Sequence, residues 1–132
     1  MNEWDGWPLD RAALLLCAGM YAGIWLQVTL MHWAGGFRKA PMWAPVLATP
    51  LFVAAAAVGA VDRGGALGWA MAVVLAVGVA EGLVGSALHV RGIVGQVGGW
   101  SLRNVLSGPP PVLPLAYSLV GVLGFTALVW NA

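Results

Sequence analysis

The sequence predicts an all-α integral membrane protein, a bundle of four transmembrane helices, from its composition and its length. Hydrophobic residues make up 61% of the chain and charged residues only 8%, against about 45–50% and about 25% in an average soluble domain. Eleven charged side chains among 132 residues are too few to cover a soluble fold of this composition. Because a spanning helix uses about 20 apolar residues, four spans and their connections fill residues 1–132 as a single transmembrane domain.

Four apolar segments are separated by turn-forming residues, and we expect helices over about 11–33, 43–61, 67–90 and 112–130. Two glycines and two cations follow the first segment. The second begins near Pro45, where proline is tolerated in a first helical turn. The sequence DRGGA at 62–66 separates the second from the third, and three prolines at 109–111 precede the fourth.

The connection 91–111 is too long for a simple turn. Ser101 is predicted to cap a short helix over residues 101–107, because serine is a strong N-cap residue. Loops of this length are more often functional than short ones. We therefore favour a docking segment in the membrane surface, with an ordinary interfacial linker as the alternative.

Charges and tryptophans predict the orientation in a cell (inner) membrane. Lysine and arginine favour the cytoplasmic side, which places loops 34–42 and 91–111 in the cytoplasm and both termini on the outer side. Tryptophan favours the interfaces, and this arrangement puts seven of the eight tryptophans there, leaving Trp25 deep. The cations in the two cytoplasmic loops are Arg38, Lys39, Arg91 and Arg103, against Arg11 and Arg63 on the outer side.

Small residues are predicted to pack the bundle. In the third segment the glycines recur at intervals of four and three residues, which places them on one helix face. Small residues at this spacing let membrane helices approach closely, and such a face is equally suited to another protein's helix. The predicted packing residues are Gly78, Gly82, Gly85, Gly121 and Gly124.

Glu81 lies near the middle of the third segment. A charged group at this depth costs about 2.5–3.5 kcal/mol on insertion scales, so the carboxyl needs either a proton or a partner. Gln27 and Tyr117 lie at a similar depth, counted along their own segments, as do Thr49 and Ser118. One interpretation is a proton relay or a ligand site, and the other is a neutral glutamic acid hydrogen-bonded to a neighbouring helix.

His32 and His89 end the first and third segments on the same predicted side. Two imidazoles from two helices can ligate a b-type haem. The alternative is ordinary interfacial histidine, which keeps its polar edge in water. There is no Cys-x-x-Cys-His motif, which excludes c-type haem, and no further ligands predict a metal site.

No catalytic motif is present, so catalysis is the less favoured class: there is no phosphate-binding loop, nucleophile elbow or zinc-protease helix. The basic residues are too few for nucleic-acid binding. Our first hypothesis is a non-catalytic subunit or partner of a larger membrane complex, through other membrane subunits or self-association. The alternatives are a b-type haem or quinone-associated electron carrier using His32 and His89, and a small proton-coupled transporter using Glu81.

Overall fold

The computed structural model describes residues 8–130, and all its regular elements in that range are helices. They are α1 (Leu9–Ala34), the short 3-10 helix η1 (Ala40–Trp43), α2 (Ala44–Val61), α3 (Gly65–Val97), α4 (Leu102–Ser107) and α5 (Val112–Val129). Four helical segments, α1, η1 with α2, α3 and α5, are long and apolar enough to cross a membrane. The prediction of an all-helical chain with four such helices is confirmed. Two of the tryptophans used for the orientation, Trp4 and Trp7, lie outside the described range.

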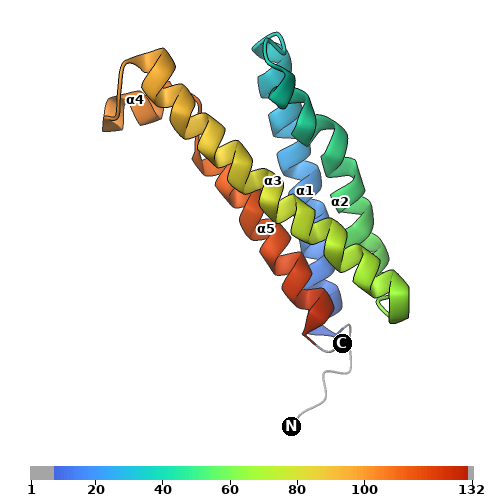
Figure 1. Cartoon of the computed structure of the whole chain (residues 1–132). Helices are drawn as coiled ribbons and strands as arrows, with labels where there is room; N and C mark the ends of the chain where they lie inside the picture. The colour runs from blue at the N-terminus through green and yellow to red at the C-terminus, as the bar shows by residue number, and fades with distance from the viewer. Residues whose placement is uncertain (1–7, 131–132) are drawn as a thin grey trace.

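The four long helices form two antiparallel pairs (Figure 1). α1 packs along α2, and α3 packs along α5, while α1 also contacts α5 and α2 contacts α3. The terminal end of the bundle holds the start of α1, the turn at 62–64 and the end of α5. At the loop end, which holds residues 35–43 and 98–111, the two pairs spread apart (Figure 1).

An aromatic cluster lies in the core, where three of the helices meet. The ring of Tyr21 lies 5.6 Å from that of Phe52 and 5.0 Å from that of Tyr117. Towards the terminal end the core continues through Cys17 and Leu75, which are fully buried. The outward faces of the helices are also apolar, with exposed leucine and valine side chains along each, as expected for helices that contact lipid.

α3 is longer than the sequence predicts, since it ends at Val97 and not at Val90. Its 33 residues extend about 50 Å, well beyond a hydrocarbon core of about 30 Å. Arg91 ends the apolar pattern in the sequence, but the helix can extend beyond its apolar part because its backbone hydrogen bonds form equally well in water. It stops only at Gly98, which takes the left-handed conformation with φ of 89° that glycine adopts at little cost.

The connection after α3 folds back on it. The side chain of Ser101 accepts a hydrogen bond from the backbone N–H of Asn104 at 3.2 Å, so the predicted capped helix is confirmed as α4. Ile93 is fully buried beside Gly108, where an added Cβ would lie 3.3 Å from its Cγ1. The connection therefore packs against the end of α3 at Gly108.

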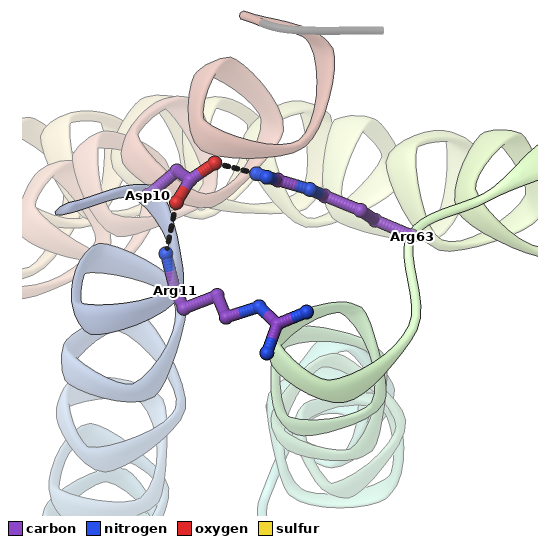
Figure 2. A network of polar contacts seen from close by, with 3 residues as sticks. All are labelled: Asp10, Arg11 and Arg63. Atoms are coloured by element: carbon purple, nitrogen blue, oxygen red, sulfur yellow. Dashed lines mark hydrogen bonds and ion pairs between the residues drawn. The ribbon is translucent and has the colours of Figure 1, made fainter. Parts of the chain in front are cut away.

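An ion pair ties the helices together at the terminal end. Asp10, in the first turn of α1, pairs with Arg63 in the turn before α3 (Figure 2). The second oxygen of the Asp10 carboxylate accepts a hydrogen bond from the backbone N–H of Arg11 at 2.8 Å. This contact joins two segments more than 50 positions apart in the sequence.

Candidate functional site

A polar cluster lies in the middle of the bundle, with one side chain from each long helix. We define it as Tyr21 on α1, Thr49 on α2, Glu81 on α3 and Tyr117 on α5. The hydroxyl of Tyr117 lies 2.8 Å from Thr49 Oγ1 and 3.4 Å from Glu81 Oε2. The Thr49 hydroxyl also donates to the carbonyl oxygen of Pro45, so these contacts connect α2, α3 and α5.

Counting protons in this cluster bears on the state of Glu81. The three contacts are Thr49 with Pro45, Thr49 with Tyr117, and Tyr117 with Glu81, and the two hydroxyl groups supply only two protons. With Tyr117 donating to Glu81 and Thr49 donating to Pro45, no proton is left for the contact between Thr49 and Tyr117. A proton on Glu81 would supply it by reversing the contact with Tyr117, so the count is compatible with a neutral glutamic acid.

Glu81 also borders a groove on the outside of the bundle, between α2 and α3. The α2–α3 groove has a volume of about 560 Å³. Oε1 of Glu81 is buried and has no hydrogen-bond partner within residues 8–130. Glu81 is the one polar residue among those that line the groove. The other residues that line the groove are Ala44, Leu47, Ala48, Val77, Ala80 and Val84.

Gln27 is separate from the polar cluster, although the sequence places it at a similar depth. Its side chain is exposed on α1 and makes no side-chain hydrogen bond within the described part of the chain. Ser118 donates instead to the backbone carbonyl of Val79, at 2.9 Å. Of the predicted polar residues, the structure thus brings Glu81, Tyr117 and Thr49 together and leaves Gln27 outside.

Tyr21 belongs to the cluster although the sequence analysis did not include it. Its hydroxyl is buried and has no hydrogen-bond partner among the described residues. Glycines on α3 and α5 make room for it: a Cβ added at Gly78 or Gly121 would lie 2.6 or 2.7 Å from this oxygen. The signal was its spacing of seven and four residues from Leu14 and Cys17, which puts all three on one helix face.

The remaining predicted packing glycines also lie at contacts between helices. A Cβ added at Gly82 would lie 2.7 Å from the carbonyl oxygen of Pro114, and one at Gly85 would lie 3.1 Å from Pro114 Cβ. At Gly124 it would lie 2.7 Å from the sulfur of Cys17. α5 therefore approaches α3 and α1 along surfaces that larger side chains would block.

The two histidines have matching hydrogen bonds at the loop end. Nδ1 of His32 lies 2.7 Å from the carbonyl oxygen of Met42, and Nδ1 of His89 lies 2.7 Å from that of Pro110. Because a carbonyl oxygen can only accept, each Nδ1 carries a proton, and in the neutral ring Nε2 then keeps its lone pair.

Two further observations limit what these histidines hold. Neither the α2–α3 groove nor a hollow of about 320 Å³ at the terminal end is lined by a histidine. Within residues 8–130, no three His, Cys, Asp or Glu side chains are grouped to hold a metal ion. The two histidines therefore do not form part of a full protein ligand set for a bare ion within residues 8–130.

Comparison with known proteins gives no relative: no family model, curated protein or solved structure matches this chain. The functional argument therefore depends on the polar cluster, the α2–α3 groove and the histidine pair.

Proposed function

We propose that this chain is a multi-pass membrane protein that acts as a non-catalytic subunit or partner in a larger membrane assembly. The observation that supports it best is that polar groups face outward from membrane-length helices. Gln27 is exposed on α1, and Glu81, whose Oε1 has no hydrogen-bond partner within residues 8–130, borders the α2–α3 groove. Unpaired polar groups are costly in lipid, and a neighbouring helix would remove that cost.

The lining of the groove supports a helix as its occupant. Ala44 and Ala48 lie one helical turn apart on α2, and Ala80 lies across the groove on α3. Small residues at such positions allow two backbones to approach closely, and polar groups then hydrogen-bond between the helices.

The loop end supports the cytoplasmic orientation that the sequence predicts. Arg38, Arg91 and Arg103 are exposed there, where anionic headgroups attract cations. Trp100 and Leu106 beside them are 64% and 78% exposed, which suits residues 98–111 to a place in the membrane surface. On this proposal the membrane is the cell (inner) membrane, and both termini lie outside.

The test is the size of the assembly in a mild detergent. The tagged chain should run on a native gel well above its 13.7 kDa monomer, alone or with co-purified proteins. Ala80→Leu, which fills the groove, should release the monomer. Val122→Leu introduces the same side chain on an exposed part of α5 and should not. A wild-type chain that is monomeric and brings down no other protein would contradict the proposal.

The second candidate is the b-type haem or quinone-associated electron carrier. It is favoured by the fixed tautomers of His32 and His89, because a backbone carbonyl on Nδ1 orients the free Nε2 for ligation. Haem brings four equatorial nitrogens of its own, so two imidazoles complete its ligand set.

A spectrum tests this candidate directly. The protein would be purified after expression with haem supplied, and its reduced-minus-oxidised absorption recorded. A sharp band that disappears in both His32→Ala and His89→Ala would support haem ligation. A featureless spectrum would reject it and leave the subunit proposal unaffected.

A further inference from the structure

We propose that α4 binds anionic phospholipid at the membrane surface, with Leu102 and Leu106 among the acyl chains and Arg103 at the headgroups. The inference rests on the place of residues 98–111 in the membrane surface, which belongs to the proposed function, and it names the class of lipid that they bind. It follows from three features of the described residues: an outward apolar face on α4, the level at which α4 lies, and a set of cations that no acid opposes.

The apolar face of α4 points away from the rest of the chain. Leu102 and Leu106 lie one helical turn apart, on the same face, and are 76% and 78% exposed. The other side of the helix is held by the chain, because Asn104 and Val105 are half-buried. Asn104 Nδ2 also donates to the carbonyl oxygen of Gly99 at 2.8 Å. The two leucines therefore form a surface outside the fold, and apolar faces of this kind favour the boundary between headgroups and acyl chains.

The start of α5 marks the edge of the hydrocarbon core. α5 begins beside His89 of α3, since His89 Nδ1 lies 2.7 Å from the carbonyl oxygen of Pro110. The 18 residues of α5 extend about 27 Å, which is close to the thickness of a hydrocarbon core, about 30 Å. If α5 crosses that core, its first residues lie at the boundary with the headgroups, and so does His89.

The end of α4 lies a short distance beyond this boundary, at the tip of α3 (Figure 1). Gly108 directly follows α4, and a Cβ added there would lie 3.3 Å from Ile93 Cγ1 and 2.8 Å from Val97 Cγ2. Ile93 and Val97 follow His89 in α3 by about 6 and about 12 Å along the helix axis, and a tilt of α3 reduces this height. The headgroup layer on each side of a bilayer is about 5–8 Å thick. The end of α4 therefore lies in this layer or at its outer border.

Positive charge surrounds α4 without an acid to oppose it. The cations at the loop end are Arg38, Lys39, Arg91 and Arg103, and all of them are exposed. Residues 34–42 and 90–111 contain no aspartate or glutamate. The phosphate of a zwitterionic lipid is accompanied by a cation of its own, whereas an anionic phospholipid brings net negative charge that attracts lysine and arginine. The charge at the loop end therefore selects anionic phospholipid as the occupant of this surface.

Thiol labelling of the full chain in vesicles tests the insertion of α4. Two variants would carry Cys17→Ala with either Leu106→Cys or Ser107→Cys, at neighbouring positions that are both exposed within the chain. Ser107 shares a helix face with Arg103, so its thiol should stay in water and react quickly with a membrane-impermeant maleimide. The thiol at position 106 should react more slowly in vesicles of phosphatidylcholine mixed with phosphatidylglycerol. Equal rates at the two positions would overturn the proposal.

The charge and the lipid composition test the class of lipid. Adding Arg103→Gln to Leu106→Cys should raise its labelling rate about five-fold, since each cation near an anionic surface contributes a free energy equivalent to about that factor. Leaving out phosphatidylglycerol should raise the rate at least as much. Arg11→Gln removes the same charge at the terminal end and should leave the rate unchanged. A rate that depends on neither phosphatidylglycerol nor Arg103 would overturn the role of anionic phospholipid.

These outcomes are distinct from those of the assembly test. A chain that forms a larger assembly in detergent but labels equally fast at positions 106 and 107 would overturn lipid binding by α4 and leave the proposed assembly standing. A monomeric chain without partners that labels slowly at position 106 would support lipid binding and contradict the assembly.

Discussion

Two pairs of glycines with the same spacing have opposite surroundings in this bundle. In α3, a Cβ added at Gly78 would lie 2.6 Å from the Tyr21 hydroxyl, and one at Gly82 would lie 2.7 Å from the carbonyl oxygen of Pro114. In α1, a Cβ added at Gly19 or Gly23 would meet nothing within 4 Å. The spacing marks a helix surface suited to close approach, and the structure shows which surface is already occupied by the same chain.

Substitution of one glycine from each pair should give the largest difference in stability between the two surfaces. Gly82→Ala should lower the free energy of unfolding by about 1–3 kcal/mol, because the added methyl collides with the α5 backbone. Gly19→Ala should cause no loss and can raise stability by up to about 1 kcal/mol, since alanine favours the helix. Thermal unfolding in detergent, followed by circular dichroism, measures both. Equal losses in the two variants would show that the α1 surface is also packed within the monomer.

The same comparison applies to the two buried tyrosines. The Tyr117 hydroxyl contacts Thr49 and Glu81, whereas the Tyr21 hydroxyl has no partner among the described residues. Tyr117→Phe should cost about 1 kcal/mol, the size of hydrogen bonds within membrane proteins. Tyr21→Phe should change stability little. Each variant lacks only one hydroxyl group relative to wild type. A larger loss of stability in Tyr21→Phe than in Tyr117→Phe would therefore mean that the Tyr21 hydroxyl has a hydrogen-bond partner of its own.

The smallest effect is expected at the terminal end. Asp10→Asn removes the charge that pairs with Arg63, and the two side chains are 10% and 29% exposed. We expect a loss near the upper end of the roughly 0.2–1 kcal/mol that solvent-accessible pairs contribute. The difference in the free energy of unfolding between wild type and Asp10→Asn should shrink as the salt concentration is raised, because salt screens the ion pair. Unfolding of wild type and variant at low and high salt measures it. A difference that persists in high salt would point to the shape of the side chain and not to its charge.

The number and approximate positions of the long helices could be predicted from the sequence, because a long apolar segment is a strong signal for a membrane-length helix. The four long segments and the Ser101 cap of α4 follow from composition and one side chain. The end of α3 did not follow: Arg91 ends the apolar pattern, but the backbone continues to Val97. Apolar periodicity therefore shows where lipid contact ends and not where the helix ends.

The site was harder to predict, because the depth of a residue along its helix does not say whether its side chain faces a neighbouring helix or the outside of the bundle. The sequence predicts similar depths for Gln27 and Glu81, yet Gln27 is exposed on α1 and Glu81 lies at the groove between α2 and α3. The position of Tyr21 depends on two glycines from other helices, which only the packed structure brings together. The histidines ended their predicted segments, but their carbonyl partners come from connections whose path the sequence does not give.

The place of Tyr117 on the last long helix has a consequence for biosynthesis. Ribosomes make the chain from its N-terminus, so α1, α2 and α3 are complete before α5 exists. During that interval Glu81 lacks the hydroxyl that faces it in the finished bundle, and Thr49 lacks its contact across the core. Glu81 is therefore made before the hydroxyl that it contacts, and the folding of α5 onto the other helices is the step that completes the polar cluster.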